Sequence, residues 1–89
     1  MLGNWLKQRI TFKEAEVKYA IQSDDLGHNP VPFGYINAQW RELVSKAKDG
    51  DELWEFRSSD DSWEHLAGDA GVVLMRNGEI IDMITTEMN

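Results

Sequence analysis

The fold of this chain is decided by residues 71–86, which read GVVLMRNGEIIDMITT. Two apolar runs rich in β-branched residues flank the dipeptide Asn77-Gly78. A type I′ turn needs positive φ at both central residues, and Asn-Gly adopts that geometry readily, so this pattern is the strongest short-range signal of a β-hairpin. We therefore expect one strand over residues 70–76 and a second over residues 79–86.

The turn also predicts the register of the hairpin, because a two-residue loop pairs Arg76 with Glu79 and, two positions along each strand, Leu74 with Ile81. In this register the two faces carry the sets Val72, Leu74, Ile81, Met83 and Val73, Met75, Ile80, Asp82, Ile84. Both faces are largely apolar, whereas an antiparallel sheet with one wet face alternates apolar and polar side chains. Something must therefore cover the second face, and two candidates stay open: the N-terminal residues 5–21 and a second copy of the protein.

A further strand and a helix precede the hairpin. Residues 51–57 include the segment ELWEFR, whose length and aromatic content are typical of a strand. A helix over residues 37–49 is predicted by apolar side chains at helical spacing, with Asn37 as N-cap and Gly50 as the C′ residue. Its inward residues are Trp40, Leu43, Val44 and Ala47. We expect an α+β domain in which a small three-stranded antiparallel sheet with a C-terminal β-hairpin packs on one or two helices.

The N-terminal third has two interpretations. Thr11 and Glu14 have the spacing of a capping box, which predicts a helix from residue 12 to about Ile21. The strand alternative stays open, because apolar residues also alternate with polar ones at Ala15, Val17, Tyr19 and Ile21. We favour the helix. Residues 3–9 lack a clear cap, so a short helix anchored by Trp5 and Leu6 is only one option there.

Two connections complete the expected topology. Residues 23–34 concentrate Asp, Gly, Asn and Pro, and we expect them to form the longest loop. Residues 60–67 fit a short helix with Ser59 as N-cap and Gly68 as its stop. Asp60 and Asp61 then lie at the positive end of that helix, and Trp63 and Leu66 are expected to face inward.

Length and composition limit the class of protein. The 89 residues (10.2 kDa) allow a single domain, 1–89. No apolar run approaches the roughly 18 residues of a membrane-spanning helix, and the N-terminus lacks the apolar stretch of a secretory signal, so we expect a cytoplasmic protein that contacts no membrane. The sequence contains no Cys, which excludes disulfides and thiolate catalysis.

The charge is unevenly distributed. Residues 1–45 are balanced, and residues 46–89 carry the whole net charge of -7. Eight carboxylates fall between residues 49 and 69, with Arg57 as the one basic residue among them. A field of this sign repels phosphate backbones and attracts basic surfaces. We therefore expect no nucleic-acid partner and predict that the binding partner is a basic protein.

The C-terminal two thirds of the chain also carries a set of short patterns. They are Gly50-Asp51-Glu52-Leu53-Trp54, Ser62-Trp63-Glu64, Leu66-Ala67-Gly68 and Arg76-Asn77-Gly78. In pattern and spacing this set resembles a group of small uncharacterised bacterial proteins. The resemblance implies no fold, activity or residue role, so it adds nothing to the functional prediction.

Few residues are placed for chemistry. Asp61 and His65 have i, i+4 spacing, but two ligands are fewer than the three or four of a zinc site, and His28 fits a loop. Neighbouring carboxylates such as Asp60 and Asp61 point in different directions in most backbones, so no acid–base pair is expected. Ser62 lies near His65 without an identifiable oxyanion hole. We expect no catalytic residue, no metal and no cofactor.

These observations predict a small acidic, non-catalytic interaction protein that binds a basic partner, as immunity proteins and antitoxins do. The residues predicted to bind that partner are Asp51, Glu52, Glu55, Asp60, Asp61, Trp63 and Glu64. Two alternatives stay open. One is a small-molecule or metal-binding domain with weak enzymatic activity, built on Asp61, His65 and the tryptophans; the other is a homo-oligomeric structural protein. The oligomeric state, monomer or homodimer, is also open.

Overall fold

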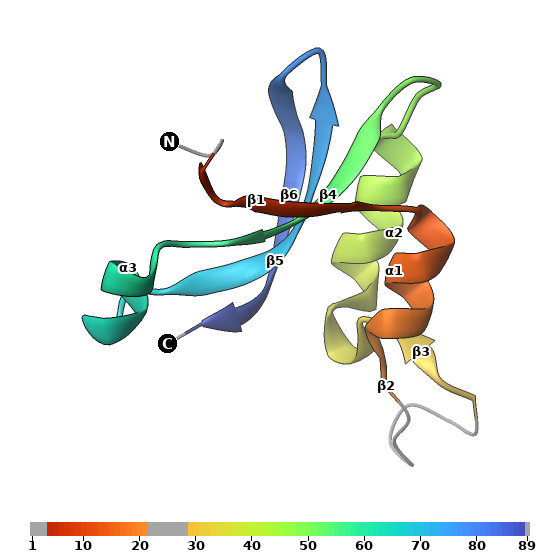
Figure 1. Ribbon diagram of the computed structural model, residues 1–89. Helices are drawn as coiled ribbons and strands as arrows, with labels where there is room; N and C mark the ends of the chain where they lie inside the picture. The colour runs from red at the N-terminus through yellow and green to blue at the C-terminus, as the bar shows by residue number, and fades with distance from the viewer. Residues whose placement is uncertain (1–3, 22–28, 89) are drawn as a thin grey trace.

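The computed structural model describes residues 4–21 and 29–88, which form an α+β fold (Figure 1). An antiparallel sheet has the strand order β1-β4-β5-β6. Its strands are β1 (Leu6–Ile10), β4 (Glu52–Arg57), β5 (Asp69–Arg76) and β6 (Glu79–Met88). The expected fold class and its three strands are confirmed. The option of a helix over residues 3–9 is wrong, because residues 6–10 pair with β4 and add a fourth strand.

The turn of the hairpin is as predicted, with positive φ of 52° at Asn77 and 80° at Gly78. The register is right for the first pairs and then wrong. An irregularity between Leu74 and Met75 places Leu74 opposite Asp82, where Ile81 was expected. A bulge of this kind exchanges the faces of the residues beyond it, here as far as a second irregularity between Ala70 and Gly71.

The exchange places Ile84 among the buried residues under the helices, together with Val72 and Leu74. It also moves Asp82 to the rim of that face, where its Oδ2 lies 3.2 Å from Nζ of Lys46. The bulge therefore buries an isoleucine and gives a carboxylate an ion pair.

Helix α1 (Phe12–Lys18) begins with the predicted capping box. The Thr11 hydroxyl accepts the Glu14 N–H at 3.0 Å, and the Glu14 carboxylate accepts the Thr11 N–H at 2.8 Å. The helix ends at Lys18 rather than Ile21. The next two residues form β2 (Ala20–Ile21), which pairs with β3 (Val31–Pro32) inside the segment expected to be a loop. The predicted helix is thus confirmed over residues 12–18, and the strand alternative is right only for its last two residues.

Helix α2 (Asn37–Lys46) follows a short 3-10 helix, η3 (Gly34–Ile36). Asn37 is already helical, and its side chain donates to the carbonyl oxygen of Pro32 at 2.9 Å, so its assignment as N-cap is wrong. Gly50, at φ 89°, turns the chain into β4 after the helix has ended at Lys46, so it is no C′ residue. Val44, expected inside, is exposed.

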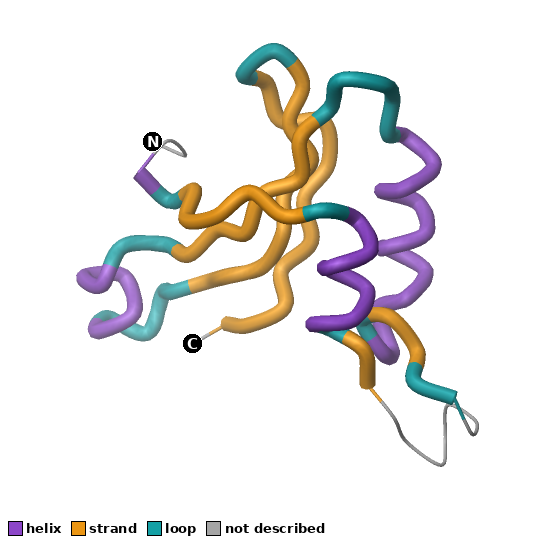
Figure 2. Tube along the Cα trace, turned by 45° about the vertical axis from the view of Figure 1, so that its right-hand side comes forward, coloured by secondary structure: helices purple, strands orange, loops and turns teal. Residues whose placement is uncertain are grey.

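Helix α3 (Asp60–Glu64) lies at the end of the sheet remote from α1 and α2 (Figure 1, Figure 2). Ser59 is its N-cap, as predicted, and accepts the Ser62 N–H at 3.3 Å. The helix is shorter than expected because Leu66 turns the chain at φ 57°. Leu66 is 78% exposed, so its expected burial is wrong, whereas Trp63 is half-buried against Gly68.

The core lies between one face of the sheet and the pair α1 and α2 (Figure 1). Trp40 and Leu43 of α2 and Ala15 of α1 are buried there, together with Phe33. The sheet contributes Ile10, Leu53, Val72, Leu74 and Ile84. Among the helices of residues 4–21 and 29–88, none has the length and hydropathy that spanning a bilayer requires.

The second face of the sheet is covered differently from the expectation. Residues 12–18 lie on the first face, and residues 6–10 lie in the plane of the sheet. Trp5 does reach the second face, where its ring stacks on Phe56 with 6.5 Å between centroids. Cover by residues 5–21 is therefore wrong except at its first residues, and the homodimer stays a prediction.

Replacement Gly71→Ala is expected to lower the free energy of unfolding by about 3 kcal/mol, at the upper end of overpacking costs. A Cβ at Gly71 would overlap the carbonyl oxygen of Ile84 on the paired strand, so β5 and β6 would have to separate. Urea unfolding followed by Trp fluorescence measures the loss. Gly50→Ala is the control, because its Cβ meets nothing within 4 Å and only the positive φ costs about 1 kcal/mol. Equal losses in the two variants would contradict the close strand contact.

Candidate functional site

The residues predicted to bind a partner lie in several separate places. Asp51 is in the turn before β4, and its carboxylate accepts hydrogen bonds from Nε and Nη2 of Arg76 at 2.7 and 2.8 Å. The Lys48 N–H also donates to it, at 2.9 Å. The hydrogen bonds from Arg76, opposed by partial desolvation, lower the pKa of Asp51 to about 2. With its side chain 1% exposed, Asp51 ties the hairpin to the end of α2 and does not face a partner.

Glu52 and Glu55 point to opposite faces of β4, because side chains alternate along a strand. Glu52 accepts a hydrogen bond from Nε1 of Trp54 at 2.8 Å. Glu55 lies on the helix side, where Nζ of Lys18 and the hydroxyl of Tyr19 donate to its Oε2 at 2.6 and 2.5 Å. The two glutamates therefore do not contribute to one acidic surface.

The remaining predicted residues do lie together, on α3. Asp60, Asp61 and Glu64, here named the α3 acidic cluster, are exposed, and the described part of the chain offers none of them an ion pair. Trp63 is half-buried, with the guanidinium carbon of Arg57 4.0 Å from its ring centroid. Of the predicted partner-binding residues, which span positions 51–64, only those on α3 therefore lie together.

Ser58 fixes the position of α3. It is buried, and its hydroxyl accepts hydrogen bonds from the Asp69 N–H at 3.0 Å and from the Ser62 hydroxyl at 2.8 Å. The first bond reaches the start of β5 and the second reaches into α3. The acidic cluster is consequently held against the end of the sheet by a buried polar contact.

The residues considered for a metal or a tryptophan-lined pocket are not brought together. Nδ1 of His65 lies 2.7 Å from the backbone oxygen of Asp61, so that nitrogen is occupied by the helix itself. Among residues 4–21 and 29–88, no group of three or more potential ligand side chains is close enough to hold a metal ion. His28 lies outside the described residues. Trp40 is in the core, Trp54 is on the second face of the sheet and Trp63 is on α3, so they line no common pocket.

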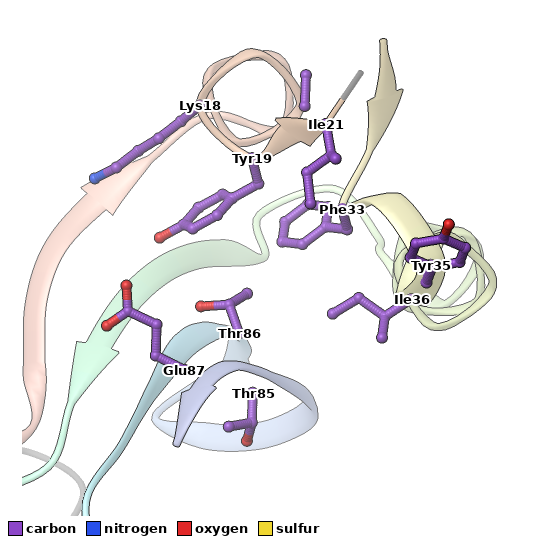
Figure 3. A pocket seen from close by; sticks show the side chains of 10 residues that line it. Lys18, Tyr19, Ile21, Phe33, Tyr35, Ile36, Thr85, Thr86 and Glu87 are labelled. Atoms are coloured by element: carbon purple, nitrogen blue, oxygen red, sulfur yellow. The ribbon is translucent and has the colours of Figure 1, made fainter. Parts of the chain in front are cut away.

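A cavity that the sequence did not predict lies between the end of α1, η3 and the end of β6. Its volume is about 440 Å³, within the range of small-molecule sites. Figure 3 shows Tyr19, Phe33 and Ile36 directed toward the same space, opposite Thr86 and Glu87. The side chains come from separate segments of the chain, so no short-range pattern could have revealed the cavity.

Phe33 forms part of the cavity wall in a strained backbone conformation. Its φ is 61°, which is rare for a bulky residue, and residues held in this way cluster at functional sites. Its ring stacks on Tyr19 and on Trp40, with centroid distances of 4.9 and 4.6 Å. The two ring contacts hold Phe33 in place against this strain.

Lys18 and Tyr19 line both this cavity and a second one of about 390 Å³, which Glu55 also lines. Burial raises the pKa of Tyr19 far above its usual value, and the hydrogen bond to Glu55 and the charges of Glu55 and Glu87 raise it further. Burial also acts to raise the pKa of Glu55, but the hydrogen bonds from Lys18 and Tyr19 outweigh it and leave that pKa lowered. Tyr19 is thus a neutral hydrogen-bond donor, and Glu55 is an ionised carboxylate that accepts hydrogen bonds from Tyr19 and Lys18.

Comparisons of the chain with protein-family models, with curated proteins and with solved structures give no match. The function is therefore inferred from two features of the chain itself, the α3 acidic cluster and the cavity beside Tyr19 and Phe33.

The variant Asp51→Asn is expected to be less stable than the wild type at pH 7, and the difference should vanish as the pH falls toward 2. The folded pKa of about 2 lies below the ordinary 3.8, so the ionised carboxylate stabilises the fold above pH 4, and this contribution is lost as the pH falls through 2. Urea unfolding at several pH values measures it.

Asp49→Asn is the matched control for this experiment, since it makes the same charge change at an exposed neighbour. A stability difference between Asp51→Asn and the wild type that stays constant from pH 7 to pH 2 would contradict the role given to the Asp51 carboxylate.

Proposed function

We propose that this protein is a small non-catalytic interaction module that binds a basic protein, in the manner of immunity proteins and antitoxins, through the α3 acidic cluster. The observation that carries the proposal is that Asp60, Asp61 and Glu64 are exposed on one short helix with no ion pair in the described ranges, on a chain of net charge -7. Charge arranged in this way steers an oppositely charged partner and fixes its orientation.

The surroundings of the cluster support the same proposal. Leu66 follows α3 and is exposed, so an apolar side chain stands beside the carboxylates. Protein interfaces combine an apolar centre with a polar rim in this manner. The buried hydroxyl of Ser58 holds α3 in place, so a partner would meet a cluster that is already ordered.

We propose a non-catalytic function because the carboxylates with shifted pKa values are held by hydrogen bonds within the fold, Asp51 by Arg76 and Glu55 by Lys18 and Tyr19. A general acid or base needs a pKa near the working pH, and these shifts run away from it. The net charge also makes a nucleic-acid partner unfavourable. We propose a cytoplasmic location, which suits a chain without cysteine.

A second candidate function, the binding of a small molecule, is favoured by one observation. The cavity beside Tyr19 and Phe33 has the size and the mainly apolar wall of a ligand site. It differs from the site that the sequence suggested for this alternative, since neither His65 nor a tryptophan lines it.

The triple variant Asp60→Lys, Asp61→Lys, Glu64→Lys is expected to bind the basic partner at least tenfold more weakly, because attraction becomes repulsion across the interface. Affinity capture from the lysate of the source organism, at low and high salt with identification by mass spectrometry, finds the partner. A partner held by exposed charges should elute as salt rises, since screening shortens the Debye length to about 10 Å at 0.1 M. Titration calorimetry with the purified partner then measures the affinities.

The matched control is Glu42→Lys, Asp49→Lys, Glu79→Lys, which makes the same change in net charge at exposed positions away from α3. Retention of the partner by the control and its loss from the α3 variant would support the proposal. Equal binding by the α3 variant and the wild type, or capture of no basic protein at low salt, would contradict it.

A further inference from the structure

The cavity beside Tyr19 and Phe33 offers an apolar wall to a ligand. The ring of Phe33 and the side chain of Ile36 border it, and Ile21 approaches from β2 (Figure 3). One face of the Tyr19 ring is occupied by Phe33, and Nζ of Lys18 lies 5.7 Å from its centroid. The aromatic residues therefore supply apolar contact, and any charge recognition must come from other groups.

The charged side chains that line the cavity are Lys18 and Glu87. The Lys18 ammonium already donates to Glu55 at 2.6 Å, which compensates its charge. Glu87 is exposed near the end of β6 and forms no ion pair in residues 4–21 and 29–88. Its negative charge contributes to the raised pKa of Tyr19, which lines the same cavity. The uncompensated charge at this wall is negative.

Two other cations, Lys7 and Arg57, line the neighbouring cavity, which also includes Glu87. Nζ of Lys7 donates to the backbone oxygen of Asn4 at 3.2 Å. The Arg57 guanidinium lies over the ring of Trp63. In the part of the chain that the structure describes, neither cation forms an ion pair with Glu87. The Glu87 carboxylate is therefore available to pair with a cationic ligand.

From these features we propose that the cavity binds a cation carried on an apolar body, such as an alkylammonium or alkylguanidinium group. The body would lie against Phe33 and Ile36, and the cation would meet the carboxylate of Glu87. Polar groups of this kind, few and placed at one end of an apolar pocket, give a ligand its orientation. No residue of the α3 acidic cluster lines the cavity, so the inference is independent of the proposed basic partner; it rests on the second candidate function and names its class of ligand.

The test uses the full ¹⁵N-labelled chain and three probes that share one apolar body: hexylamine, hexan-1-ol and hexanoate. At pH 7 they carry a positive charge, no charge and a negative charge. Two-dimensional NMR titrations should show that hexylamine shifts the amide signals of Tyr19, Phe33 and Thr86. Hexylamine should bind about fivefold more tightly than hexan-1-ol, the ratio that one partly exposed ion pair supplies, and hexanoate should bind least.

The variant Glu87→Gln should reduce the affinity for hexylamine about fivefold, to that of hexan-1-ol. Glu79→Gln is the matched control, because it removes the same charge at the exposed opposite end of β6 and should leave hexylamine binding unchanged. Glu87 is exposed, so its replacement leaves the core intact, and thermal unfolding checks this.

A further probe, Nα-acetyl-lysine methylamide, distinguishes a basic side chain of a peptide from a free alkylamine as the ligand. If it binds within about threefold of hexylamine at the same amides, the cavity accepts a basic side chain of a peptide. If hexylamine alone binds, it accepts a free amine. Both outcomes support the proposal. It is overturned if no amine shifts these amides, if hexanoate binds as tightly as hexylamine, or if Glu87→Gln and Glu79→Gln bind hexylamine equally.

Discussion

The packing of Trp40 into the space between the two helices and the sheet is the contact on which the rest of the structure depends. Its ring stacks on Phe33 and meets the ring of Phe12 at 5.9 Å, so one side chain joins α2 to α1 and to the segment before η3. Its Nε1 donates to Glu16 at 3.0 Å, which satisfies the polar atom of a buried indole. Because Phe33 in turn stacks on Tyr19, the same contact also supports the wall of the cavity.

The acidic composition of the chain serves two purposes, and the structure separates them. Asp51 and Glu55 are structural, because each accepts a hydrogen bond from a positively charged side chain, Arg76 or Lys18, and so links segments far apart in the sequence. The α3 acidic cluster and Glu87 are exposed, and the described residues give them no ion pair. Charge density along a sequence therefore overstates the charge that a surface presents, because carboxylates used inside the fold are counted with those that face solvent.

The two candidate sites differ in how they are built. The α3 acidic cluster is local, since one helical turn and the cap at Ser59 bring its carboxylates together. The cavity is assembled from α1, the segment around Phe33 and the end of β6, and it exists only after α1 and α2 have packed on the sheet. A change in core packing would consequently disturb the cavity before it disturbed the cluster.

The features that depend on a few neighbouring residues could be predicted from the sequence. The type I′ turn at Asn77-Gly78, the capping box of α1 and the α3 acidic cluster were all predictable, because backbone φ preferences and short hydrogen bonds decide them. The bulge that brings Ile84 into the core and the pairing of β1 with β4 follow only from the packing of the whole chain. The same is true of the cavity that Glu87 lines. These features arise because apolar surface must be buried between segments distant in the sequence, and no local pattern records which segments will meet.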